Sequence, residues 1–258
     1  VLNSNRISEG KFVKQFEEEW AKFVGTKYSV LFNSGSSALI AGLTALKYNH
    51  YISEDSKVIT SPLTYIATAN SIVHAGFEPV FVDVDRKTFG ITPESIDALP
   101  HIKHDDYLNV IMPVHLMGFP CDMDGIHEIA DAYGMMVFED SAQAHGSVYT
   151  GKERKGRTGS LSHLSGFSFY VAHNIQVGEM GALNTDDPKI ATMARKIKGN
   201  GRVCDCITCT RTSKCKRVNE PYDPRFTHDV IGYNFKTTEI SAALGLVQLK
   251  HFESNFRK

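Results

Sequence analysis

Short apolar segments with strand character alternate with helical segments along most of the 258-residue chain. The predicted strands are 28–32, 58–60, 79–84, 110–115, 136–139, 167–169 and one that starts at 182. The predicted helices are 8–24, 38–47, 66–74, 94–98, 123–133 and 237–256. Strands that alternate with helices form crossover units, which build a mostly parallel sheet covered by helices on both faces. The sequence therefore predicts an α/β fold of three layers.

Length and net charge limit the number of domains and the classes of partner that are compatible with this chain. The 258 residues suit one large α/β domain or two small ones. A net charge of −1 argues against nucleic acid or a membrane surface as the main partner. No apolar run approaches the roughly 18 to 20 residues that span a bilayer, and no segment reads as a signal peptide, so we expect a cytoplasmic protein. The chain starts at Val1 and stops at Lys258 within an amphipathic run, and we expect a fragment cut at both ends.

The C-terminal third contains a change of composition. Residues 195–217 are rich in Lys, Arg and Cys, and their basic side chains indicate a solvated charged face, or else a surface for a nucleotide diphosphate or an electron donor. Four of the five cysteines lie between Cys204 and Cys215, a density that favours metal or redox chemistry over a disulfide framework. The helix predicted at 237–256 has an apolar face. This face comprises Ile240, Leu244, Val247 and Phe252.

Three segments at predicted strand ends carry side chains suited to chemistry. The Gly/Ser turn 33–37 precedes a helix and offers N–H groups and hydroxyls to a phosphate, although an ordinary helix cap has the same pattern. Asp140 follows a buried strand, where a carboxylate can hold a protonated ring nitrogen or cap the next loop. His173 follows the strand at 167–169 and suits proton transfer near neutral pH or a structural role.

Six motifs occur in order along the chain. They are Ser-Gly-Ser-Ser-Ala (34–38), Ser-Pro-Leu-Thr-Tyr-Ile-Ala-Thr (61–68), Glu-Asp-Ser-Ala-Gln-Ala-His-Gly (139–146), Phe-Ser-Phe-Tyr-Val-Ala-His-Asn (167–174), Gly-Glu-Met-Gly-Ala (178–182) and Gly-Tyr-Asn-Phe-Lys-Thr (232–237). Together they resemble the vitamin-B6-dependent nucleotide-sugar aminotransferases of the DegT/DnrJ/EryC1/StrS family. The resemblance implies a fold-type-I large domain over 1–258, with a seven-stranded sheet and without the small C-terminal domain.

The resemblance also implies a site for pyridoxal or pyridoxamine phosphate. Gly35 and Ser36 would bind the cofactor phosphate, and Ser168 would add a hydroxyl. Asn234 resembles the residue that reaches the phosphate of a neighbouring subunit, which implies a homodimer with shared active sites.

Three further residues would contact the cofactor ring. Tyr65 would stack on the pyridine ring, Asp140 would pair with its nitrogen, and Gln143 would contact its hydroxyl.

His173 occupies the position at which the family's aminotransferases carry the lysine that binds the cofactor covalently. Imidazole cannot form that bond, and no lysine lies between Lys155 and Lys189. Sugar 3-dehydratases of the same family carry histidine there and use pyridoxamine phosphate. The resemblance therefore implies a 3-dehydratase of a nucleotide-linked 4-keto-6-deoxyhexose, in deoxysugar or lipopolysaccharide O-antigen biosynthesis, with His173 as the base.

Two alternatives stay open. An aminotransferase of the same family would need a catalytic lysine from outside this sequence. A catalytically inactive homologue would bind only cofactor or metal.

The cysteine segment also resembles part of this family. Cytidine-diphosphate-sugar 3-dehydratases carry a [2Fe–2S] cluster in a similar loop before the Gly-Tyr-Asn motif, and a reductase supplies them with electrons. One of their ligands follows the aspartate of the 140 region, where this chain has Ser141 and Ala142. An iron–sulfur cluster or zinc is therefore expected at four thiolates. These are Cys204, Cys206, Cys209 and Cys215.

Overall fold

The central element of the computed structural model is a mixed β-sheet. The structure describes residues 1–4, 6–100, 102, 105–204, 206, 217 and 219–256. Within these residues, seven strands form one sheet in the order β1-β9-β8-β5-β4-β2-β3. Their bounds are β1 (Tyr28–Phe32), β2 (Lys57–Thr60), β3 (Glu78–Phe81), β4 (Leu108–Ile111), β5 (Met136–Asp140), β8 (Leu164–Ser168) and β9 (Gly181–Thr185).

The sheet is mainly parallel, as the alternating pattern predicts. β3, β2, β4, β5 and β8 run parallel to one another, whereas β9 is antiparallel to both of its neighbours, β8 and β1. A separate hairpin of β6 (Val148–Thr150) and β7 (Lys155–Arg157) lies outside this sheet. Since the parallel strands share one direction, their carboxyl ends meet at one edge, where ligands bind in open α/β sheets.

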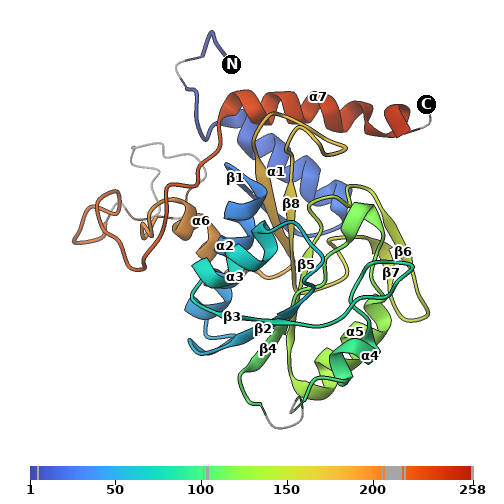
Figure 1. Cartoon of the computed structure of the whole chain (residues 1–258). Coiled ribbons are helices and arrows are strands. Elements are labelled where there is room, and N and C mark those ends of the chain that lie inside the picture. The colour runs from blue at the N-terminus through green and yellow to red at the C-terminus, as the bar shows by residue number, and fades with distance from the viewer. Residues whose placement is uncertain are drawn as a thin grey trace.

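Helices cover both faces of the sheet, so the predicted three-layer α/β fold is confirmed (Figure 1). One layer consists of α2 (Gly35–Tyr48), α3 (Ala67–His74) and α6 (Pro188–Lys198). The other consists of α1 (Lys11–Val24), α4 (Pro93–Asp97), α5 (Met123–Tyr133) and α7 (Glu239–Phe256). A short 3₁₀ helix, η1 (Leu116–Gly118), follows β4. None of the helices described has the length and apolar content needed to cross a bilayer.

The layer that contains α1 is packed with aromatic rings. Phe16 and Trp20 of α1 are fully buried against Phe167 and Phe169, with ring centroids 5.0 to 5.3 Å apart in the edge-on pairs. Edge-to-face pairs of this kind stabilise a core beyond the area that they bury. The end of β8 is therefore held firmly from the side opposite to α2.

The apolar residues that the sequence analysis groups on one face of α7 do not form its buried side. Ile240, Leu244 and Val247 of α7 are between 42 % and 58 % exposed, and only Phe252 of the predicted apolar face is buried. The buried side of α7 instead includes Ala242, with Leu246 and Leu249 packed against the core. The helix is apolar on two sides, so the pattern alone does not identify the buried one.

At the start of the basic segment two cations are paired and largely buried, whereas residues 207–216 lie outside the described part of the chain. The basic segment begins inside α6, a helix that the sequence analysis did not predict. Arg195 forms an ion pair of 2.8 Å with buried Glu17, and Lys198, only 2 % exposed, lies 2.9 Å from Glu9. These cations fasten α6 to the N-terminal region, because a buried charge is stable only when it is paired.

Candidate active site

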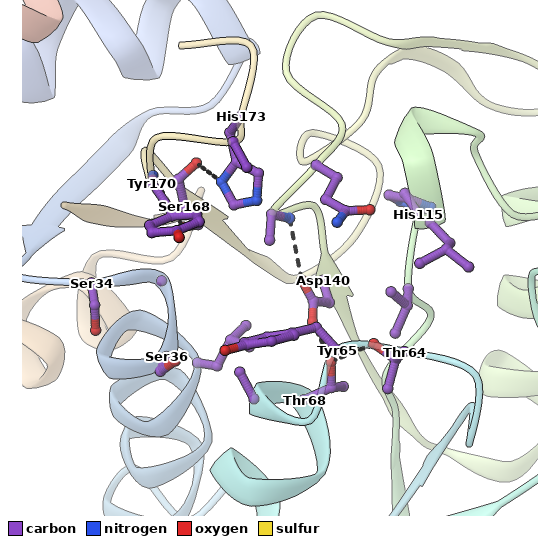
Figure 2. Close-up of a pocket in the computed structure, with 18 of the residues that line it drawn as sticks. Ser34, Ser36, Thr64, Tyr65, Thr68, His115, Asp140, Ser168, Tyr170 and His173 are labelled. Carbon is purple, nitrogen blue, oxygen red and sulfur yellow. Dashed lines mark hydrogen bonds between the residues drawn. The ribbon is translucent and has the colours of Figure 1, made fainter. Parts of the chain in front are cut away.

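A cavity of about 440 Å³ opens at the carboxyl ends of β5 and β8, beside the N-termini of α2 and α3. Figure 2 shows side chains from these segments directed into it. Seven of the eight residues predicted to hold the cofactor or act as the base line this cavity. They are Gly35, Ser36, Tyr65, Asp140, Gln143, Ser168 and His173.

The N-terminus of α2 forms one end of the cavity. Ser34 caps the helix by accepting a hydrogen bond of 3.1 Å from the backbone N–H of Ser37. The N–H groups of the first turn have no partner within the helix, which makes this end a site for an anion. A Cβ atom on Gly35 would lie 2.6 Å from the Cβ of Ser168. Glycine therefore lets the helix end approach the end of β8 closely.

Asp140 is the charged group at the floor of the cavity. Its carboxylate is 4 % exposed and accepts hydrogen bonds from Thr68 Oγ1 (2.7 Å) and the Ala142 N–H (3.2 Å). Thr68 is in turn hydrogen-bonded to Thr64 (2.8 Å). Burial raises the pKa of Asp140 despite these two donors. A cationic N–H donor in the cavity would compensate this cost.

Tyr65 and Gln143 stand at the cavity's open side. Tyr65 is 74 % exposed, and in Figure 2 it lies across the cavity from His173. Gln143 Oε1 accepts a hydrogen bond of 2.9 Å from the Met117 N–H. That bond fixes the side-chain oxygen of Gln143, so its NH₂ group is the part left to donate to a ligand.

His173 is half-buried and held by one hydrogen bond. Its Nδ1 lies 2.9 Å from the carbonyl oxygen of Ser168, which can only accept, so Nδ1 carries the proton in the neutral ring. Nε2 therefore has the free lone pair. Burial lowers the pKa of His173, while the Ser168 carbonyl, Asp140 and Glu179 oppose this shift in that order. The ring is neutral at pH 7, the form that a base requires.

Asn234 does not join the cavity. Its side chain is exposed, and its backbone pairs with Gly199 in an isolated bridge.

The structure describes only part of the predicted thiolate site. Cys204 is half-buried and Cys206 is exposed, whereas Cys209 and Cys215 lie outside the described residues. No group of three or more His, Cys, Asp or Glu with metal-binding geometry occurs in the part of the chain that the structure describes. The metal site stays a prediction.

The model of the DegT/DnrJ/EryC1/StrS aminotransferase family matches residues 1–258. The chain belongs to this family. The resemblance carried by the six motifs is thereby confirmed.

The relatives of this DegT-family chain are named for different activities. It is 35 % identical to GDP-perosamine synthase of Caulobacter vibrioides over 96 % of the chain, and 35 % identical to dTDP-4-dehydro-2,6-dideoxy-D-glucose 3-dehydratase of Saccharopolyspora spinosa over 95 %. The chain spans 59 % and 54 % of these two proteins. The chain is also similar to a solved structure, that of E. coli GDP-4-keto-6-deoxy-D-mannose-3-dehydratase with bound hydrated PLP. The TM-score is 0.83 and the sequence identity is 27 %. This match covers 98 % of the chain and 63 % of that protein.

The family's cofactor fits the groups in the cavity. Pyridoxal and pyridoxamine phosphate carry an anionic phosphate, an aromatic ring and a protonated ring nitrogen. The helix N-terminus at Gly35 suits the phosphate, and the buried Asp140 carboxylate, which accepts from Thr68 and Ala142, suits the ring nitrogen. Tyr65 supplies an exposed aromatic face between these two ends.

Sequence reasoning missed several residues of the cavity in this DegT-family chain. Thr68 is the most informative, because it connects α3 to the Asp140 carboxylate. Thr64 and Thr68 are four positions apart at a predicted helix start, a spacing that places both hydroxyls on one side. The other missed lining residues include Ser34, His115, Tyr170 and Glu179.

His115 connects the cavity wall to a buried hydrogen-bond network. Its Nδ1 accepts from the Cys121 N–H (3.2 Å), so Nε2 carries the proton and donates to Glu139 (2.9 Å). Glu139 also accepts from the N–H groups of Gly159 (2.7 Å) and Leu161 (3.0 Å). This carboxylate has a structural role, since it fastens the 159–161 loop to the strand that carries Asp140.

Proposed function

We propose that the chain acts as a pyridoxamine-phosphate-dependent 3-dehydratase of a nucleotide-linked 4-keto-6-deoxyhexose. The observation that carries the proposal is His173. An imidazole whose Nε2 lone pair is free adjoins the cavity at the position where lysine is expected in the family's aminotransferases. Histidine can transfer protons but cannot bind the cofactor covalently as an imine.

Two of the similar proteins support this chemistry. A relative with 35 % identity and a structural neighbour with a TM-score of 0.83 are both named as 3-dehydratases of nucleotide-linked keto sugars. Their substrates suggest the substrate class proposed here.

The residues of the cavity would have different roles in this reaction. Bound pyridoxamine phosphate supplies a primary amine for a 4-keto carbonyl and an electron-withdrawing ring. Asp140 would keep the ring nitrogen protonated, because a buried carboxylate favours a cationic partner. His173 would take up a proton at Nε2, and the Ser168 carbonyl at its Nδ1 would stabilise the imidazolium. Asp140 and Glu179 favour the same charged state from farther away.

The test is turnover by His173→Asn in the presence of pyridoxamine phosphate and a nucleotide-linked 4-keto-6-deoxyhexose. We expect loss of dehydration by about 100-fold or more, which is the typical contribution of a positioned base. Cofactor binding should change little, because the phosphate and ring-nitrogen partners are intact. His74→Asn, which changes an exposed histidine of α3, is the matched control. Undiminished dehydration in His173→Asn would show that another group is the base.

A second candidate is transamination, favoured by the 35 % identity to GDP-perosamine synthase. It requires a lysine that holds the cofactor covalently. Borohydride treatment separates the two candidates: cofactor that remains attached after denaturation supports transamination, and cofactor that is released supports the dehydratase.

Further parts of the proposal concern partners. They are a homodimer in which Asn234 reaches the neighbouring phosphate, an iron–sulfur or zinc centre at the cysteine segment, and a reductase that supplies electrons. Metal analysis of the purified protein tests the second of these.

A further inference from the structure

The segment 168–173 follows strand β8 and carries two residues with roles proposed above, Ser168 and His173. Tyr170 lies between them in the chain, lines the same cavity and is 45 % exposed. In Figure 2 these three residues lie together on one side of the cavity, across from Tyr65. The roles proposed above use Ser168 and His173 but leave Tyr170 without one.

The backbone of Tyr170 is hydrogen-bonded to both of these residues. Its N–H donates to Ser168 Oγ (3.4 Å), and its carbonyl oxygen accepts from the His173 N–H (2.9 Å). Because Ser168 Oγ accepts from this N–H, its own proton is left to donate to an anion. The second bond closes a turn over 170–173. This turn brings the imidazole of His173 back to the Ser168 carbonyl, which accepts from Nδ1 at 2.9 Å.

The side chain of Tyr170 also contacts His173. The two rings meet edge-to-face, with centroids 5.9 Å apart and planes at 75°. A second ring contact to His173 comes from His145, at 6.0 Å and 73°. His145 is 1 % exposed and stacks on Phe167 and Phe169, so it belongs to the aromatic core. Of the two rings, only Tyr170 lines the cavity together with His173.

A single hydrogen bond does not fix the orientation of an imidazole. The bond from His173 Nδ1 to the Ser168 carbonyl allows the ring to tilt and turn about that contact. A second ring in edge-to-face contact restricts this motion, because aromatic pairs favour that arrangement over others. A base acts efficiently only when its lone pair is held within reach of the proton that it removes. In His173 this lone pair is on Nε2.

We propose that Tyr170 is a positioning residue for His173. Its ring packs edge-to-face on the imidazole and thereby keeps Nδ1 on the Ser168 carbonyl and Nε2 available to the cavity. This inference rests on the role proposed above for His173. Tyr170 takes up no proton itself and acts only through the orientation of the His173 ring.

The first measurement is ¹⁵N NMR of the histidine rings at pH 7, without added substrate. The His173 signals are assigned by their loss in His173→Asn. A neutral ring with its proton on Nδ1 gives two well-separated nitrogen signals. In Tyr170→Leu we expect these signals to move toward each other, because a ring released from the carbonyl exchanges between both tautomers. Tyr170→Phe keeps the ring contact and should leave the signals in place.

The second measurement is turnover of a nucleotide-linked 4-keto-6-deoxyhexose. In Tyr170→Leu we expect kcat to fall about 10-fold while KM changes less than about 2-fold, because the base is present but held less precisely. This loss is smaller than the one expected for His173→Asn. Tyr170→Phe should keep kcat within about 2-fold, since the ring contact is retained. Tyr107→Leu is the matched control, because Tyr107 is 49 % exposed and precedes β4 at the edge of the sheet away from the cavity.

Unchanged nitrogen signals in Tyr170→Leu would overturn the proposal. A loss of kcat in Tyr170→Phe as large as in Tyr170→Leu would also overturn it, because the hydroxyl would then be the group that matters. The NMR measurement does not depend on turnover. Retained dehydration in His173→Asn would therefore refute the proposed function, whereas unchanged signals in Tyr170→Leu would refute only the role of Tyr170.

Discussion

At the scale of single residues, Gly35 determines how closely the first turn of α2 approaches the end of β8. An added methyl group would lie 2.6 Å from Ser168 Cβ and 3.2 Å from its Cα. We expect Gly35→Ala to destabilise the protein by about 1–3 kcal/mol through overpacking. It should also weaken binding of pyridoxal phosphate, because the phosphate-binding N–H groups move. Urea unfolding and a cofactor titration measure the two effects.

The control for Gly35→Ala is Gly199→Ala. A methyl group on Gly199 would have its nearest neighbours at 3.5 Å, an ordinary contact. We expect a change within about 0.5 kcal/mol and unchanged cofactor binding. Equal effects of the two substitutions would refute the role given to Gly35.

His145 makes the stability of the protein depend on pH. Its pKa is about 3 in the folded state and near 6.5 when unfolded, so between these values only the unfolded chain gains the proton. Stability is therefore lost as the pH falls below 6.5. Urea unfolding at pH 7 and pH 5 measures this loss. Each pH unit between the two pKa values changes the free energy of unfolding by about 1.4 kcal/mol for one proton. We therefore expect the loss of unfolding free energy between pH 7 and pH 5 to be smaller by about 2 kcal/mol in His145→Phe than in the unsubstituted protein. An identical loss in both proteins would contradict this account, and His74→Asn is the control.

Much of the cavity could be predicted at this scale because its residues occur in ordered motifs. The motifs indicated Gly35, Asp140 and His173, which the structure brings to one cavity. His145 lies inside one of these motifs, but its position between aromatic rings depends on tertiary packing. The hydrogen bond from Thr68 to Asp140 spans 72 positions, and periodicity carries no signal for it.

At the scale of elements, α1 depends on a carboxylate from α7. Gly10 provides no side-chain cap, and Glu239 instead accepts hydrogen bonds from the N–H groups of Gly10 (2.8 Å), Phe12 (3.0 Å) and Val13 (2.9 Å). Glu239 is 3 % exposed. We expect Glu239→Gln to lower the free energy of unfolding by about 1.5–3 kcal/mol, because charged hydrogen bonds at a helix N-terminus are lost.

The matched control for Glu239→Gln is Glu18→Gln on α1. Glu18 is exposed and forms a 3.7 Å ion pair with Lys14. Surface pairs of this kind contribute about 0–1 kcal/mol. Urea unfolding that gives the same loss for both variants would show that the cap contributes little.

This cap also explains an error in the predicted boundary of α1. The pattern of apolar residues predicted a start at residue 8, but Ser8 pairs with Thr238 in a bridge and the helix begins at Lys11. The start of α2 differs in the opposite direction, since the Gly/Ser turn is itself the first helical turn. Local patterns identify the elements, whereas long-range contacts set where they begin.

At the scale of the whole molecule, the proposed shared active sites make a quantitative prediction. Asn234 is exposed and outside the cavity of its own chain, whereas His173 lines it. If each site takes His173 from one chain and Asn234 from the other, a mixed dimer of His173→Asn and Asn234→Ala contains one intact site. We therefore expect activity to reappear when the two inactive variants are unfolded together and refolded. Each variant refolded alone is the control, and mixtures without activity would refute the sharing of sites.

The sequence predicted the direction of most strands in the sheet but not their order. Alternating strands and helices predicted a parallel sheet, and the structure confirms this for five strands. The antiparallel position of β9 between β8 and β1 was not predicted. The spacing of apolar residues indicates where a strand forms. Which strands pair with each other depends on burial across the whole core, so the pattern does not predict it.

Glu239 and Gly10 are 229 positions apart. A ribosome makes the chain from its N-terminus, so α1 leaves the exit tunnel long before its capping carboxylate has been synthesised. At about 5–20 residues per second, the delay is on the order of ten seconds or more. A 14-residue helix is marginal by itself in water during that interval. The N-terminal cap of α1 therefore forms only after residues near 239 have been translated.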